Sequence, residues 1–71
     1  MRVSEAIEYC YKVLENSKIP NAKLDSEIFV SSLVHLERSE ILSNLNNNFE
    51  NSLKVKLDEL IVRRIKREPV S

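Results

Sequence analysis

The stretch LKVKLDELIVRRIKR, residues 53–67, has the most regular apolar spacing in this chain of 71 residues. Its apolar side chains recur at intervals of three and four residues, which is the period of a helix with one buried face. The residues on that face are Leu53, Leu57, Leu60, Ile61 and Ile65. We expect a helix that begins near Asn51 or Ser52 and ends near Arg67, because Pro69 disfavours the helical conformation of the residue before it.

The beginning of the chain has the same helical period. Its apolar side chains fall at Val3, Ile7, Cys10 and Leu14. This spacing predicts a helix over residues 4–16, and Ser4 is a suitable N-cap for it. A shorter helix is expected later in the chain, where Ser39 can serve as the N-cap.

The segment after Pro20 predicts the remaining helix, because the fixed φ of proline suits a helix start. Its apolar residues point almost all round the helix axis. They are Leu24, Ile28, Phe29, Val30, Leu33, Val34 and Leu36. A helix that is apolar on every side is normally surrounded by other helices. We therefore expect this helix at the centre of the domain, with Ile28 buried there.

The breaks between the helical segments contain asparagine where other proteins use glycine, which this chain lacks. Asn16 and the cluster over residues 44–48 lie at such breaks, and asparagine tolerates the left-handed conformation of turns. No segment alternates with the period of a strand. The sequence thus predicts an all-α fold, a small bundle of about four to five short helices.

The composition argues against several classes of protein. Loops that cradle a nucleotide need glycine, so no such loop is expected in a chain that has none. Eleven basic and eleven acidic residues give zero formal charge, which disfavours direct nucleic-acid binding. No apolar run approaches the roughly 18 residues of a membrane span. The single cysteine suits a reducing cytoplasm, and we expect a monomer there.

Few residues are candidates for chemistry. Cys10 lies on the apolar face of the first helix, so an inert core thiol is expected. His35 has no neighbouring ligand pattern for a metal, and we expect a partly buried or boundary histidine. Asp25 and Glu27 point apart on one helix, which favours interaction with the helix dipole over acid–base catalysis. No catalytic, cofactor-binding or metal-binding residue is predicted.

The basic residues near the end of the chain are the strongest candidates for an interaction site. Arg63 is expected to be solvated and to pair with Glu59 one turn earlier. Arg64 is different, because it falls on the same line as the core residues of its helix. We expect Arg64 to meet a neighbouring domain, so that its removal leaves the stability of this domain almost unchanged. Val55 and Val62 face the opposite, solvent side.

Three segments, taken in order, resemble a known family. They are KLDSEIFVSSLVHL at 23–36, ERSEILSNLN at 37–46 and LDELIVRRIKREPVS at 57–71. The resemblance is to the amino-terminal domain of the HemK (PrmC) family, the peptide chain release factor glutamine methyltransferases. The family's Leu-Asp-Ala-Glu helix start, its Arg-Ser/Thr-x-Leu-Leu-like turn, its paired arginines and its Glu-Pro-Ile/Val ending are all matched. The matching residues are Leu24, Asp25, Ser26 and Glu27; Arg38, Ser39, Ile41 and Leu42; and Arg63, Arg64, Glu68, Pro69 and Val70. Ser26 replaces the usual alanine, and Arg67 stands where the family often has glycine.

This resemblance implies a division of labour within a longer enzyme. Residues 1–67 would be the helical substrate-recognition domain, and residues 68–71 would begin a linker to a methyltransferase domain. That second domain would bind S-adenosylmethionine and methylate the glutamine of the Gly-Gly-Gln motif in class 1 release factors. The chain itself would bind no cofactor and would be non-catalytic. Arg63, Arg64, Glu68 and Pro69 are candidates for contact with the release factor or with the methyltransferase domain.

Two other classes remain as alternatives. A free-standing helical adaptor for protein–protein interaction has a composition of the same kind. A helix-turn-helix DNA-binding protein also has short crossing helices, but it needs a basic surface and an exposed recognition helix. The neutral charge and the core-facing apolar stripe of residues 53–67 argue against the DNA-binding alternative.

Overall fold

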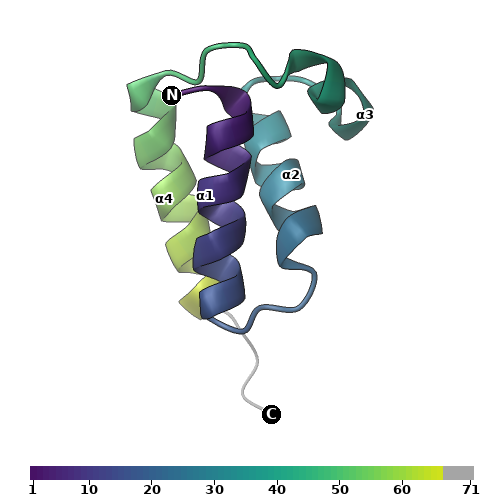
Figure 1. Ribbon diagram of the computed structural model, residues 1–71. Helices are drawn as coiled ribbons and strands as arrows, with labels where there is room; N and C mark the ends of the chain where they lie inside the picture. The colour runs from purple at the N-terminus through teal and green to yellow at the C-terminus, as the bar shows by residue number, and fades with distance from the viewer. Residues whose placement is uncertain (67–71) are drawn as a thin grey trace.

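The computed structural model describes residues 1–66, which form four α-helices and one short 3-10 helix. In chain order these are α1 (Val3–Asn16), α2 (Ala22–Leu33), α3 (Arg38–Ile41), the 3-10 helix η1 (Leu42–Asn44) and α4 (Asn51–Lys66). The three long helices pack side by side, each in contact with the other two, and α3 lies across one end of the bundle (Figure 1). The predicted all-α fold is confirmed for these residues.

The starts of two helices differ from the sequence prediction. The N-cap of α1 is Arg2 rather than Ser4, and the amide of Arg2 donates a 2.7 Å hydrogen bond to Glu5 Oε1. The N-cap of α3 is Glu37 rather than Ser39, and the amide of Glu37 donates to Glu40 Oε1 at 2.9 Å. In both helices a glutamate three residues after the N-cap accepts a hydrogen bond from the backbone amide of the N-cap residue. A prediction that considers only serine N-caps misses these helix starts.

The loop before α4 satisfies the first turn of α1. The amide of Val3 donates to the carbonyl of Asn47 at 2.9 Å, and the amide of Ser4 donates to that of Leu45 at 3.0 Å. The first amides of a helix lack partners within the helix itself. The asparagine-rich loop was predicted over residues 44–48, and the structure is non-helical there except for Asn44, which ends η1. This loop holds the start of the chain at the top of Figure 1.

The ends of α1 and α2 have the same geometry, although the chain has no glycine. Lys18 and His35 have left-handed backbones with φ of 61° and 59°. After α1, the amide of Ile19 donates to the carbonyl of Leu14 at 3.0 Å, which is the long hydrogen bond of a Schellman motif. The matching bond after α2 joins the amide of Leu36 to the carbonyl of Ser31 at 2.9 Å. Glycine normally occupies the left-handed position in this motif.

The prediction that α2 is the centre of the bundle holds only in part. α2 contacts α1, α3 and α4, but α1 buries as many residues, and the expected burial of Ile28 is wrong. Ala6, Cys10 and Leu14 of α1 are fully buried. In α2, by contrast, Leu24 and Ile28 are 38% and 43% exposed. The reason is that α2 turns its small residues inward, so its larger apolar side chains lie at the edge of the core. The inward residues at intervals of four are Ala22, Ser26 and Val30.

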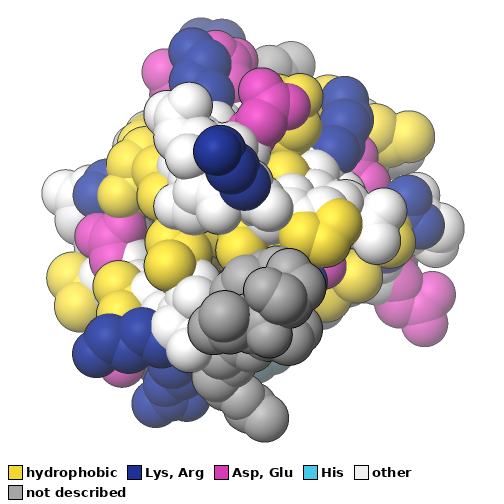
Figure 2. Space-filling model, turned by 90° about the horizontal axis from the view of Figure 1, so that it is seen from below, with side chains coloured by type: hydrophobic (Ala, Val, Ile, Leu, Met, Phe, Trp, Pro, Cys, Tyr) yellow, Lys and Arg dark blue, Asp and Glu magenta, His cyan; other side chains and the backbone are white. Residues whose placement is uncertain are grey.

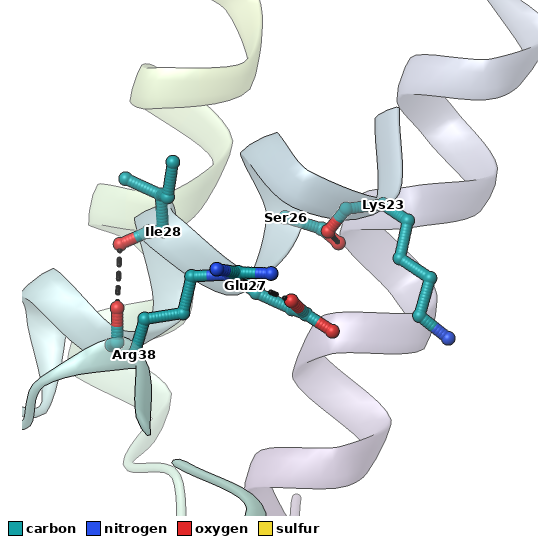
Figure 3. Close-up of polar contacts among 6 residues, drawn as sticks. Lys23, Ser26, Glu27, Ile28 and Arg38 are labelled. Carbon is teal, nitrogen blue, oxygen red and sulfur yellow. Dashed lines mark hydrogen bonds and ion pairs between the residues drawn. The ribbon is translucent and has the colours of Figure 1, made fainter. Parts of the chain in front are cut away.

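The burial of Ser26 causes no polar defect. Its hydroxyl donates to the carbonyl of Lys23 at 2.7 Å, one turn earlier on the same helix (Figure 3). The hydroxyl of Ser31 does the same with the carbonyl of Ile28 at 3.0 Å. A buried hydroxyl without such a partner would cost about 1–3 kcal/mol. Ser26 can therefore occupy a fully buried position without an unpaired hydroxyl.

Replacement of Leu14 and Ile28 by alanine tests which of these two side chains belongs to the core. Leu14→Ala should lower the free energy of unfolding by about 2–5 kcal/mol, since a fully buried leucine leaves a cavity. Ile28→Ala should lower it by about 1 kcal/mol or less, because the side chain of Ile28 is partly exposed at the surface. Urea denaturation of both variants measures this difference. Equal losses would mean that Ile28 is buried as deeply as Leu14.

Glycine at the two left-handed positions should stabilise the domain. Lys18→Gly and His35→Gly remove a backbone penalty of about 1–2 kcal/mol per residue, from which the entropy cost of glycine must be subtracted. We expect each to raise the midpoint of thermal unfolding by a few degrees. Lys56→Gly is the control, because Lys56 is an exposed residue inside α4. This substitution should lower the free energy of unfolding by about 1 kcal/mol. A lower midpoint for Lys18→Gly would contradict the account of the α1 end.

Candidate functional site

Two acidic residues of α2 connect it to the other helices. Arg64 Nε donates to Asp25 Oδ2 at 3.0 Å, which joins the end of α4 to the start of α2. Arg38 Nε donates to Glu27 Oε1 at 3.1 Å, which joins α3 to α2 (Figure 3). The carboxylates of Asp25 and Glu27 are only 20% and 15% exposed, so both ion pairs are shielded from water on one side.

These pairs change the interpretation of the acidic residues. Asp25 and Glu27 do point apart, as predicted, and Asp25 lies in the first turn of α2, where a negative charge is favourable. Each of them also has an arginine partner far away in the sequence, which dipole complementarity did not suggest. The acidic and basic positions of the motifs that resemble the HemK family therefore pair with each other: Asp25 with Arg64, and Glu27 with Arg38.

The two predicted arginines lie together at one hollow. Phe29 of α2 and Leu60, Arg63 and Arg64 of α4 line a depression of about 480 Å³. Arg64 is partly buried and binds Asp25, whereas Arg63 is exposed. The structure thus brings an apolar wall and two guanidinium groups together. The two other predicted contact residues, Glu68 and Pro69, and the expected helix end at Arg67 lie outside the described residues.

The outward face of α4 has a second, shallower hollow. Val55, Asp58, Glu59, Val62 and Arg63 line about 380 Å³ there. The two valines are 61% and 47% exposed, which confirms that they face solvent. The predicted ion pair between Glu59 and Arg63 does not form, and within residues 1–66 neither side chain makes an ion pair or hydrogen bond.

A third hollow of about 270 Å³ lies between α1, α2 and the segment after α3. Ile7, Tyr11, Leu42 and Leu45 form its apolar part, and Leu42 is 70% exposed. Two carboxylates at its edge already have partners. Glu8 pairs with Lys12 at 3.0 Å, and Glu27 pairs with Arg38.

The titratable groups show no catalytic arrangement in the described part of the chain. Burial, with smaller contributions from Asp25 and Asp58, raises the pKa of the Cys10 thiol to about 12, so the predicted inert thiol is confirmed. His35 is exposed at the end of α2, and the expectation of a partly buried histidine is wrong. Residues 1–66 contain no cluster of side chains suited to a metal ion.

A polar cluster joins α1 to α4 on another side of the bundle. Tyr9 Oη donates to Asp58 Oδ1 at 2.5 Å, and Lys54 Nζ donates to Asp58 Oδ2 at 3.2 Å. The hydrogen bond from Tyr9 is the main reason that the pKa of Asp58 is lowered, and it also raises the pKa of Tyr9. The ammonium group of Lys54 lies 4.5 Å from the centre of the Tyr9 ring. These contacts fix α4 against α1.

The fold and these surfaces define a small all-α domain with its own core and several shallow hollows on its surface. No helix within residues 1–66 combines the length and the apolar character that a membrane span requires. The chain belongs to the PrmC N-terminal domain family, whose model matches residues 5–71. The resemblance seen in the sequence is thereby confirmed. Searches of curated proteins and of solved structures each found no significant match.

A double-mutant cycle on Asp25 and Arg64 measures how much this ion pair contributes to the fold. From the sequence alone, removal of Arg64 was expected to leave the stability almost unchanged. The ion pair predicts a loss of stability instead, because the shielded carboxylate of Asp25 would be left without this guanidinium. The coupling free energy between Asp25→Ala and Arg64→Ala should be about 0.5–1.5 kcal/mol. Arg63→Ala is the matched control and should change the stability little. A coupling near zero would show that the pair is not formed in solution.

Proposed function

We propose that this chain is the substrate-recognition domain of a protein-glutamine methyltransferase, and that its partner is a class 1 peptide chain release factor. The observation that carries the proposal is the match to the PrmC N-terminal domain family over residues 5–71. In that family the helical domain is associated with holding the release factor against a catalytic domain, which methylates the glutamine of the Gly-Gly-Gln motif.

The residues of this chain support a binding role and not a role in bond-making. The thiol of Cys10 is buried with a raised pKa, and the carboxylates of Asp25 and Glu27 are engaged in ion pairs. No glycine is present for a loop that holds a nucleotide-like cofactor. The domain would hold the protein substrate in the correct orientation for the reaction. This raises the reaction rate, because a substrate held in this way loses no further translational and rotational freedom.

The methyl donor would belong to the catalytic domain. S-adenosylmethionine would bind there and supply the methyl group, and the present chain would neither bind it nor contact it. The enzyme would work in the cytoplasm, where release factors act. It would bind neither nucleic acid nor a membrane through this domain.

Arg63, Arg64, Glu68 and Pro69 stay the proposed residues for contact with the catalytic domain or with the release factor. The contact of Arg64 with Asp25 suits this role, because it holds the last turns of α4 against α2. Arg64 would then act by positioning the end of α4, while Arg63 has an exposed guanidinium that is available to a neighbour.

Titration of the isotope-labelled chain with a class 1 release factor tests the proposal. We expect the amide signals of one contiguous surface to shift in a saturable way, while the signals of buried residues such as Ala6 and Leu14 stay in place. An elongation factor of similar size is the control and should shift none of them. S-adenosylmethionine alone should also have no effect.

Two results would count against this function. The absence of any shift at release factor concentrations well above those in cells would show that the chain does not recognise this partner. Equal shifts with the elongation factor would favour the alternative of a general protein-binding adaptor.

A further inference from the structure

The last turn of α4 is held to the rest of the domain by few contacts. The fully buried residues of α4 are Leu57 and Ile61, and the residues after them, up to Lys66, are exposed or only partly buried. In this last turn Ile65 packs partly against the core, and Arg64 binds Asp25. Of the ion pairs within residues 1–66, this one alone joins the last turn of α4 to another helix.

The ion pair belongs to a contact that spans one turn of each helix. Asp25 and Phe29 are four residues apart on α2, and Leu60 and Arg64 are four residues apart on α4. Residues with this spacing lie on one side of a helix. Phe29, Leu60 and Arg64 line the same hollow, and the start of α2 lies at the same end of the bundle as the end of α4 (Figure 1). The helices thus meet through an ion pair at this end and through apolar side chains one turn further in.

Asp25 is a firm support for the guanidinium of Arg64. It lies in the first turn of α2, where its amide donates to the carbonyl of Asn21 at 2.9 Å. The side chains of Asp25 and Arg64 are 20% and 30% exposed, and partial shielding from water strengthens the attraction between charges. The planar guanidinium also forms hydrogen bonds in fixed directions. The pair therefore restrains how the last turn of α4 lies against α2.

We propose that Asp25 is a positioning residue for methylation of the release factor. Through Arg64 it fixes the direction of the last turn of α4, and the segment that would join this domain to the catalytic domain follows that turn in the sequence. The family match continues through this segment to residue 71. The inference rests on the proposed function and adds the contact that orients the bound release factor relative to the catalytic domain.

This role predicts a particular effect on the reaction. In the proposed enzyme, the helical domain holds the release factor and the catalytic domain holds the methyl donor. A change in the direction of the last turn of α4 would move the target glutamine relative to the methyl group. A misplacement of about 1 Å can lower a reaction rate about a hundredfold. Loss of Asp25 should therefore lower kcat, while the surfaces that bind the two substrates stay intact.

Steady-state methylation by the full-length enzyme tests this effect in Asp25→Ala, at a temperature where thermal unfolding shows the variant to be folded. We expect kcat to fall about tenfold or more, while KM for the release factor and KM for S-adenosylmethionine stay within about twofold of the wild type. Arg64→Ala should cause the same loss. The double variant should lose no more than either single variant, because both residues act through one contact.

Two further substitutions at the same position separate the charge from the rest of the side chain. Asp25→Glu keeps a carboxylate and should recover most of the wild-type kcat. Asp25→Asn keeps the shape of the side chain but removes the charge, so it should lower kcat in the same direction as alanine. It also serves as the test variant if Asp25→Ala unfolds at the assay temperature.

Glu27→Ala is the matched control. It removes an ion pair of the same kind from the same helix, with 3.1 Å between Arg38 Nε and Glu27 Oε1. That pair holds α3, which lies across the opposite end of the bundle from the end of α4 (Figure 1). We expect Glu27→Ala to lower the midpoint of thermal unfolding by a similar amount and to leave kcat unchanged.

Hydrogen exchange of backbone amides gives a readout that does not depend on activity. In Asp25→Ala the amides of residues 63–66 should exchange about three- to tenfold faster than in the wild type, because the last turn opens more often. The amides of residues 57–61 should keep their wild-type rates, since Leu57 and Ile61 still anchor that part of α4 in the core. Unchanged exchange at residues 63–66 would contradict the restraint by Asp25.

The kinetic results distinguish the inference from the function on which it rests. If the wild-type enzyme methylates release factors and Asp25→Ala keeps full kcat, the inference is wrong and the proposed function stands. A higher KM for the release factor with unchanged kcat would place Asp25 at the docking surface and would also overturn the inference. An equal loss of kcat in Glu27→Ala would do the same, because any loosening of α2 would then suffice. A wild-type enzyme that does not methylate release factors refutes both.

Discussion

The close packing of α1 against α2 is the constraint on which the rest of the structure depends. Both helices bury small or medium residues in the core, with Ala6 and Cys10 on α1 and Ala22 and Ser26 on α2. Small side chains allow two helix backbones to approach closely, and the larger apolar residues then fill the remaining space. Because Ser26 satisfies its hydroxyl on its own helix, this approach leaves no buried polar group unpaired.

The third long helix is positioned by polar contacts at two heights of the bundle. Near its middle, Asp58 accepts hydrogen bonds from Tyr9 and Lys54, and near its end Arg64 binds Asp25. The apolar face of α4 supplies Leu57 and Ile61 to the core. One side of α4 is occupied in this way, and its outward side carries the exposed Val55 and Val62.

The end of the bundle from which the chain leaves α4 is not uniformly polar. Viewed from this end, apolar surface alternates with separate basic and acidic side chains (Figure 2). A domain of this size cannot cover all its apolar atoms, so scattered exposure of this kind is normal. Val55 and Val62 differ from this scattered exposure, because they lie on one line along α4.

Much of the fold could be predicted from the sequence, because the apolar period of each segment is strong. The bounds of α1 and the start of α4 were predicted to within about two residues, the usual uncertainty of helix ends. The left-handed backbones of Lys18 and His35 were missed, because asparagine was expected at such positions. Asn21 is the third residue with a left-handed backbone. The order of apolar residues along α2 also could not show which of its sides faces α1. The interval of four residues between Ala22, Ser26 and Val30 is the signal that could have identified the inward side.

The candidate site was predicted less completely, because contacts between distant residues leave no trace in a local pattern. Arg64 was recognised as unusual from its place on the core-facing line, but its partner Asp25 is 39 residues away. The pair of Glu27 with Arg38 was missed for the same reason. The exposed positions of Val55 and Val62, in contrast, followed directly from the helical period.

Site-specific photo-crosslinking is the most direct test of the central claim that this domain holds a class 1 release factor. A photoreactive amino acid would replace the exposed Val62 in one sample of the full-length enzyme and the exposed Leu42 in another, and each would be irradiated with a class 1 release factor. We expect a crosslinked product from at least one of these positions. Crosslinking from neither position would contradict the account.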